Sequence, residues 1–80
     1  MTVIEEVTHV GVKAVFRALP HATTPKVLFQ LDRRDRIVLM LLDGRRTLHD
    51  VAGLIHRSEV DVAHTLVQLL QSGYIEFLDY

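Results

Sequence analysis

Histidine, arginine and the acidic residues are the side chains of this sequence that could do chemistry, and their spacing limits which chemistry is open. The chain has five histidines and no cysteine. His49 and His56 lie seven positions apart, which is ~10 Å along a helix and too far for one metal ion. The sequence has no nucleophile paired with a base, no glycine-rich phosphate loop and no carboxylate pair. We therefore expect no metal, no cofactor and no catalysis.

Basic residues are concentrated in the first half of the chain. Residues 1–40 hold six Lys or Arg against four acids, and residues 41–80 hold three against six, so the halves carry +2 and −3. Clustered arginines are suited to carboxylates and phosphates. The alternative is that they are solvated and pair locally with Asp32, Asp35 and Asp43. The candidate anion or phosphate site comprises Arg33, Arg34, Arg36, Arg45 and Arg46.

Three positions repeat the chemistry of a helix N-terminus, in which a capping side chain is followed three residues later by an acid. These pairs are Asp32 with Asp35, Thr47 with Asp50, and Ser58 with Asp61. They predict helices over about 33–43, 48–56 and 59–72. Gly44 and Gly73 stand where left-handed C-terminal caps would end the first and third helices.

The helices differ in the pattern of their apolar residues. The first is apolar without interruption over residues 37–42, which predicts burial on most sides. The second has one apolar stripe, and the third has an apolar half that includes Val60 and a polar half that includes Ser72. The expected core comprises Val38, Leu41, Leu42, Val51, Leu54, Ile55, Leu66, Val67 and Leu70.

The segments on either side of the helices are typical of β-structure. Apolar residues alternate over 10–18, residues 26–31 form a short β-branched and aromatic run, and two prolines bracket the turn between them. These patterns predict an N-terminal β-hairpin, with a helix over residues 2–19 as the alternative. Residues 74–80 predict a C-terminal strand. The expected fold is a single α+β domain over residues 1–80, or one domain of a longer protein.

The helix pattern carries a resemblance to a known superfamily. The run LDGRRTLHDVA over residues 42–52, followed by LLQSGYIE over residues 69–76, resembles the signature of winged-helix or winged helix-turn-helix domains. It is similar to the PqqD-like peptide recognition elements and to bacterial winged-helix signalling modules. The link over residues 56–58 is itself too short for anything but a helix-turn-helix corner. The resemblance implies the binding of a protein or peptide.

The third helix decides between a protein partner and DNA. Residues 58–80 contain no Lys or Arg, whereas Glu59, Asp61, Glu76 and Asp79 are acidic, so this helix would repel a duplex. We expect a non-catalytic protein or peptide interaction module with a regulatory or adaptor role. The alternative is a small DNA-binding transcriptional regulator that uses the arginines. The candidate partner-binding residues are Asp61, His64, Thr65, Gln68 and Gln71.

The C-terminal strand carries more apolar surface than one face of a sheet can bury. We expect a homodimer, or a peptide that adds a strand to the same edge. The alternatives are burial of this surface under the N-terminal hairpin, or a chain that continues past Tyr80 into more structure. The longest apolar runs are far shorter than the ~20 residues of a membrane helix, and the lack of cysteine suits a cytoplasmic location. The candidate dimer residues are Tyr74, Phe77, Leu78 and Tyr80.

Overall fold

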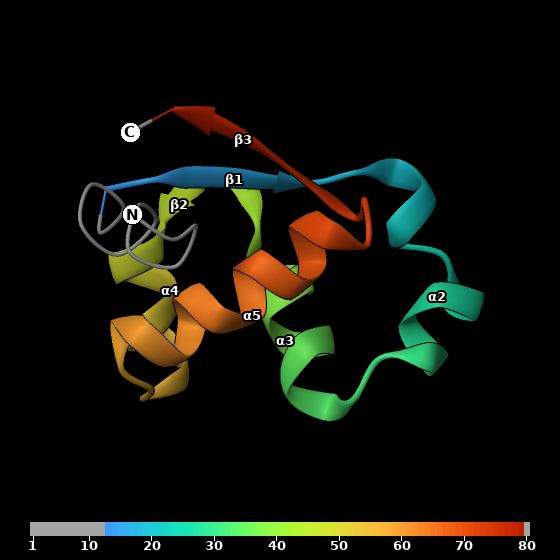
Figure 1. Cartoon of the computed structure of the whole chain (residues 1–80), viewed down its shortest axis with the longest axis horizontal. Helices are drawn as coiled ribbons and strands as arrows, with labels where there is room; N and C mark the ends of the chain where they lie inside the picture. The colour runs from blue at the N-terminus through green and yellow to red at the C-terminus, as the bar shows by residue number, and fades with distance from the viewer. Residues whose placement is uncertain (1–12, 80) are drawn as a thin grey trace.

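A computed structural model describes residues 13–79 and has an α+β fold. A three-stranded antiparallel sheet in the order β2-β1-β3 lies along the top of the molecule in Figure 1, and helices α3, α4 and α5 lie beneath it. The short helix α2 stands apart, beyond the end of β1 (Figure 1). The elements are β1 (Val15–Ala18), the 3-10 helix η1 (Pro20–Ala22), α2 (Pro25–Gln30), α3 (Arg33–Leu41), β2 (Asp43–Thr47), α4 (Leu48–Ile55), α5 (Glu59–Gln71) and β3 (Ile75–Asp79). The expected α+β class is confirmed.

The starts of the three main helices are confirmed, because the capping chemistry is local. The side chains of Asp32, Thr47 and Ser58 accept hydrogen bonds from the backbone N–H three residues later, at 2.9, 3.1 and 3.1 Å. At α4 the bond is reciprocal, since the Asp50 carboxylate accepts the N–H of Thr47 at 3.0 Å. Each cap satisfies backbone donors that the first turn of a helix leaves without a partner.

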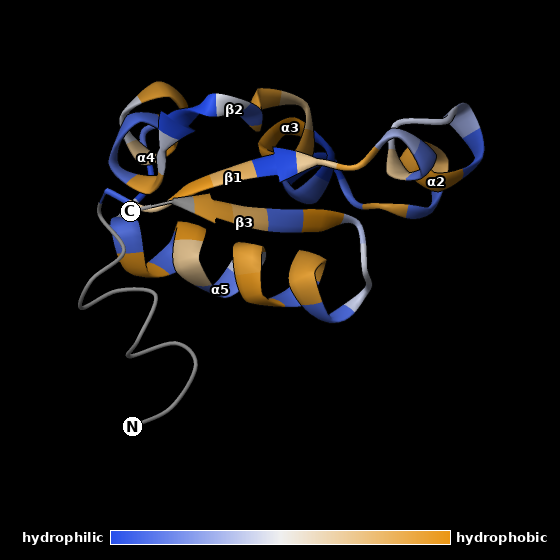
Figure 2. Ribbon diagram, turned by 90° about the horizontal axis from the view of Figure 1, so that it is seen from above, coloured by the Kyte–Doolittle hydropathy of each residue, from blue (hydrophilic) through white to orange (hydrophobic). Residues whose placement is uncertain are grey.

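The alternation of apolar residues in β1 matches its position in the sheet. Figure 2, seen from above, shows β1 between β2 and β3. Phe16 is buried opposite Phe77, with the ring centroids 5.6 Å apart, and Ala18 lies opposite buried Ile75. Arg17 points to the other face, where it pairs with Glu76. The strand predicted over 10–18 is thus confirmed for residues 15–18, and residues 10–12 lie outside the described part.

The predicted partner strand over residues 26–31 is wrong, because this segment forms α2. Thr24 caps that helix by accepting from the N–H of Val27, and Pro25 occupies its first turn, where a missing N–H costs nothing. The strand that pairs with β1 on this side is β2. The alternative of a helix over residues 2–19 is also wrong where the structure describes it, since residues 15–18 are a strand.

Most of the expected core residues are buried, but the helices are covered on fewer sides than their apolar content suggests. Helix α3 packs on α5 yet leaves Ile37 and Met40 exposed, so it is not buried on most sides. Leu54 is 54% exposed and Val60 also faces outward, contrary to expectation. Of the other expected core residues, Val38, Leu42, Val51, Leu66 and Val67 are buried, and Leu41, Ile55 and Leu70 are partly buried.

Both predicted left-handed glycines have positive φ, but their places differ. Gly73, at φ 75°, follows the C-cap of α5 as expected. Gly44, at φ 86°, lies inside β2, because α3 already ends at Leu41. A Cβ at Gly44 would meet the Leu78 side chain at 3.3 Å. Among residues 13–79, no helix is both long enough and apolar enough to cross a membrane.

Candidate functional site

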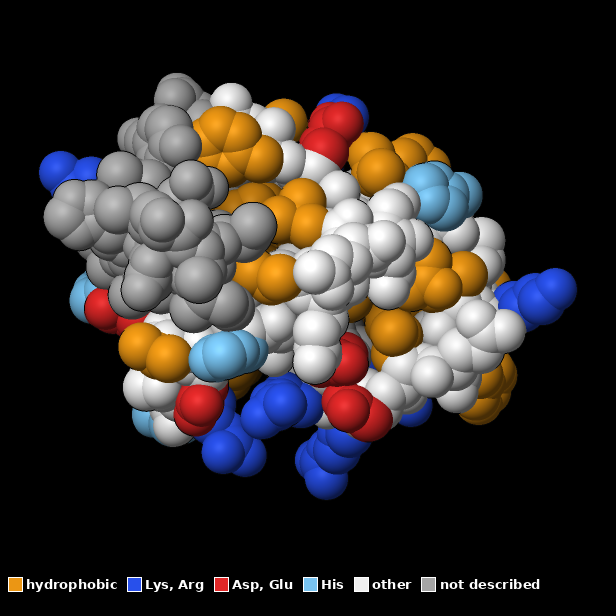
Figure 3. Space-filling model, viewed as in Figure 1, with side chains coloured by type: hydrophobic (Ala, Val, Ile, Leu, Met, Phe, Trp, Pro, Cys, Tyr) orange, Lys and Arg blue, Asp and Glu red, His pale blue; other side chains and the backbone are white. Residues whose placement is uncertain are grey.

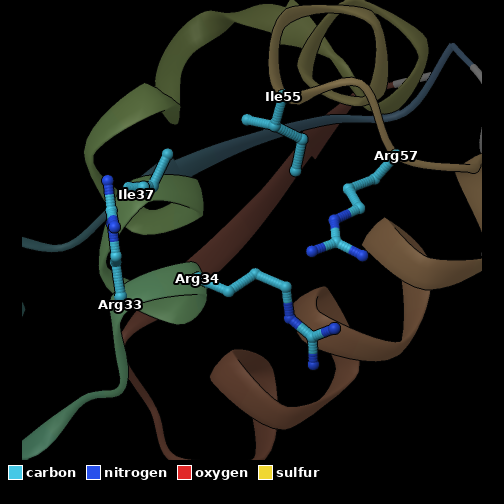
Figure 4. Close-up of a pocket in the computed structure, with 5 residues that line it drawn as sticks. All are labelled: Arg33, Arg34, Ile37, Ile55 and Arg57. Atoms are coloured by element: carbon cyan, nitrogen blue, oxygen red, sulfur yellow. The ribbon is translucent and has the colours of Figure 1, made fainter.

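A hollow of about 400 Å³ opens between the start of α3 and the corner that joins α4 to α5. We call it the arginine groove. Figure 4 shows Arg34 and Arg57 extending toward one another across it, with Ile37 and Ile55 on its closed side, while Arg33 points away from Arg34. Its lining residues are Arg33, Arg34, Ile37, Ile55 and Arg57.

Two local structures bring these arginines to one place. The Asp32 cap starts α3 at Arg33, so Arg33 and Arg34 stand in its first turn. On the other wall, α4 ends because His56 adopts a left-handed conformation at φ 56°. The N–H of Arg57 then bonds back to the carbonyl of Ala52 at 3.0 Å. This turn directs Arg57 toward α3.

The electrostatics of the groove are one-sided. Elsewhere arginines have acidic partners, since Arg17 pairs with Glu76 and Arg46 lies 3.6 Å from Asp43. Within the described part of the chain, the three groove arginines form no ion pair, and no acidic side chain lines the hollow. Figure 3 shows Lys and Arg side chains projecting from the lower border of the molecule, with Asp or Glu side chains beside them; α3 and the α4–α5 corner form this border in Figure 1.

The acid nearest to the groove arginines in the sequence is Asp35, which follows Arg34 directly. Partial burial raises the pKa of the Asp35 carboxyl, the charge of Asp32 raises this pKa further, and Arg34 opposes the rise. One carboxylate oxygen of Asp35 is buried without a hydrogen-bond partner among residues 13–79. Asp35 thus interacts electrostatically with Arg34 but does not line the groove.

The structure divides the five arginines that the sequence grouped as an anion site. Arg33 and Arg34 line the groove. Arg36 donates to the carbonyl of Leu31 at 3.2 Å, and Arg46 donates to the carbonyl of Leu41 at 3.1 Å, so both serve the fold. Arg45 is exposed on β2 and does not line the groove.

Arg57 lines the groove, although it is not one of the five arginines of the anion site predicted from the sequence. The signal that could have found it is its place in the three-residue corner between two helices. Here α5 packs on α3, so the corner at the start of α5 lies near the start of α3 and lines the same hollow. Arginine keeps its charge in proteins, so the groove can hold a carboxylate or a phosphate but has no base to offer.

Of the five residues predicted to form a partner-binding face on α5, four are exposed and one is buried. Asp61, His64, Gln68 and Gln71 are exposed, but Thr65 is 1% exposed and its hydroxyl has no partner among the described residues. Thr65 follows Val62 by three positions and precedes Leu69 by four, so it stands on the buried side. The prediction that Thr65 belongs to the partner face is wrong, because the side of α5 that carries Val62, Thr65 and Leu69 is buried in the core.

The predicted dimer residues take different positions. Tyr74 is partly buried, with its ring centroid 6.4 Å from that of His21, and Phe77 packs on Phe16. Leu78 is exposed and lies over Gly44. Tyr80 lies outside the described residues.

Within residues 13–79, the most exposed of the large apolar side chains belong to α2 and α3. Phe29 is 82% exposed and Met40 is 65% exposed. Met40 and Leu28 also line a second, shallow hollow of about 460 Å³ between α2, α3 and the end of β1. We call Leu28, Phe29 and Met40 the apolar ridge.

Comparison with known proteins leaves the resemblance in the sequence as a prediction. No family model, no curated protein and no solved structure matches this chain. In residues 13–79, no group of three or more His, Asp or Glu side chains is arranged to hold a metal ion.

Proposed function

We propose that this protein is a non-catalytic interaction module with a regulatory or adaptor role, and that its partner is a protein. The observation that carries the proposal is the exposure of Phe29 and Met40. They are the two most exposed of the large apolar side chains in the described chain, and exposed apolar patches mark sites of protein contact. Aromatic residues and methionine are also enriched in protein interfaces.

The partner contact is proposed for side chains and not for the edge of β2. The backbone N–H groups of Arg45 and Arg46 donate to the carboxylate of Asp43 at 2.9 and 3.1 Å. These bonds hold the pKa of the Asp43 carboxyl below its usual range. An added strand would have to displace them, so β2 is a poor template for strand addition.

DNA binding is the second candidate, favoured by the unpaired arginines of the arginine groove. Against it stands the charge of α5 and β3, which contain no Lys or Arg and carry Glu59, Asp61, Glu76 and Asp79. A duplex needs several phosphate contacts along its length. The acidic surface of α5 therefore favours a protein partner over DNA. A cytoplasmic location is part of the same proposal.

The proposal is tested by capturing partners with the immobilised full chain and with Phe29→Ser and Met40→Ser variants. We expect a protein to bind the wild type and to be lost from both variants. The control is Leu54→Ser, which removes an equally apolar exposed side chain from α4 and should keep the partner.

A titration with random duplex DNA at several salt concentrations separates the second candidate. Sub-micromolar affinity that falls steeply with salt and is lost when Arg34 and Arg57 become Gln would replace the protein-partner proposal by DNA binding.

A further inference from the structure

We propose that the arginine groove binds an acidic segment of a protein partner, with carboxylates on Arg34 and Arg57 and an aliphatic side chain on Ile37 and Ile55. The inference rests on the proposed function in that the occupant is a protein. It adds a second contact surface to the apolar ridge and states the chemistry that this surface recognises.

Charge complementarity identifies the anionic part of the occupant. Three arginines line the groove, and within the described chain none of them forms a salt bridge. Like charges gathered in one hollow repel one another, so a negative group that enters relieves this repulsion as well as forming its own hydrogen bonds. Guanidinium groups bind carboxylates with two parallel hydrogen bonds.

The isoleucines identify the rest of the occupant. Ile37 is exposed and Ile55 is half-buried, and both line the hollow between the charged groups. A free inorganic anion would leave this apolar surface in water. A peptide in which acidic and aliphatic residues alternate covers both kinds of surface at once.

The size and position of the groove favour a peptide over a duplex. A hollow of about 400 Å³ falls in the range of small-ligand sites, ~300–1,000 Å³, and accepts one or two side chains. The helix that leaves the corner, α5, presents the acidic Asp61 and no basic residue. A duplex long enough to reach more phosphates would run against this charge.

The arginines of the groove are also free to serve a partner without cost to the fold. Neither Arg34 nor Arg57 donates a side-chain hydrogen bond to the described chain, in contrast to Arg36 and Arg46. Substituting them should therefore change binding and leave the free energy of unfolding nearly unchanged.

The probe is an acetylated, amidated hexapeptide of alternating glutamate and leucine, titrated into the isotope-labelled full chain and followed by NMR. Two further peptides replace either every glutamate by glutamine or every leucine by serine. We expect the first peptide to shift the methyl resonances of Ile37 and Ile55 and the Nε resonances of Arg34 and Arg57. Both altered peptides should bind more weakly.

The decisive variant is the double substitution Arg34→Gln/Arg57→Gln. Its matched control, Lys26→Gln/Arg45→Gln, removes the same positive charge from exposed residues outside the groove. We expect the dissociation constant of the peptide to rise about tenfold or more in the groove variant, because charge-assisted hydrogen bonds are lost. In the control it should stay nearly unchanged.

Four outcomes would overturn the inference. Equal weakening in both double variants would show that only net charge matters. Shifts confined to Phe29 and Met40 would move the peptide to the apolar ridge. Stronger shifts of the groove resonances with inorganic phosphate or duplex DNA would make the occupant a phosphate. A partner captured equally well by the groove variant would refute the groove and leave the proposed function standing, whereas a chain that captures no partner refutes the proposed function.

Discussion

Gly44→Ala should destabilise the fold although it adds only one methyl group. Gly44 lies in β2 at φ 86°, a left-handed conformation that costs an L-residue ~1–2 kcal/mol. The new Cβ would also meet the Cδ1 of Leu78 at 3.3 Å, closer than ordinary van der Waals contact. The lower entropy of the unfolded chain returns ~0.4–1 kcal/mol. We expect a net loss of ~1–2 kcal/mol in the free energy of unfolding.

Two other glycines separate the backbone contribution from the contact. Gly73 has a similar φ of 75°, and a Cβ there would have no atom within 4 Å, so Gly73→Ala reports the backbone cost alone. Gly53 lies inside α4, also with no atom within 4 Å, and its φ is ordinary. Gly53→Ala should therefore stabilise the protein by ~0.5–1 kcal/mol.

The assay is urea unfolding of the three variants, followed by circular dichroism and analysed at constant slope. The expected order of stability is Gly53→Ala, wild type, Gly73→Ala and Gly44→Ala. Combining Gly44→Ala with Leu78→Ala should recover the part of the loss that comes from the contact. Equal stability of Gly44→Ala and Gly53→Ala would refute the reasoning, because it would mean that the backbone at Gly44 tolerates an L-residue.

Leu66→Ala, at a fully buried position, should lower the free energy of unfolding by ~2–5 kcal/mol, and a loss below about 1 kcal/mol in urea unfolding would place Leu66 outside the core. Thr65→Val should raise the free energy of unfolding by ~1 kcal/mol, because it removes a buried hydroxyl without a described partner. A lower free energy of unfolding in urea would show instead that the hydroxyl is hydrogen-bonded. The hydrogen bond from His49 to Glu59 raises the pKa of His49 above its ordinary value of 6.5. Its contribution to stability is present below that value and is lost as pH rises through the folded pKa, so Glu59→Gln should lower the His49 pKa measured by NMR, while Glu76→Gln leaves it unchanged. Sedimentation equilibrium should reveal a dimer of the full chain, and a mass near 9.1 kDa at every concentration would remove the support for self-association.

The sequence determined the features that depend on neighbours a few positions apart. A cap bonds to the N–H three residues later, so Asp32, Thr47 and Ser58 fixed the helix starts whatever the rest of the chain does. The same local logic should have identified α2, where Thr24 and Pro25 form a helix start. The β-branched and aromatic residues of that segment predict a strand instead, but β propensity depends on context more than helix propensity does.

Only the tertiary structure decided which residues meet across the chain. The pairing of β1 with β2 joins residues separated by α2 and α3, and no local pattern specifies such a partner. Thr65 is buried because α5 packs against the rest of the molecule, and Ile37 is exposed because none of the described elements covers that side chain. The arginine groove follows the same rule. The sequence shows which residues carry positive charge, but only the packing of α3 against α5 brings Arg34 and Arg57 to one hollow.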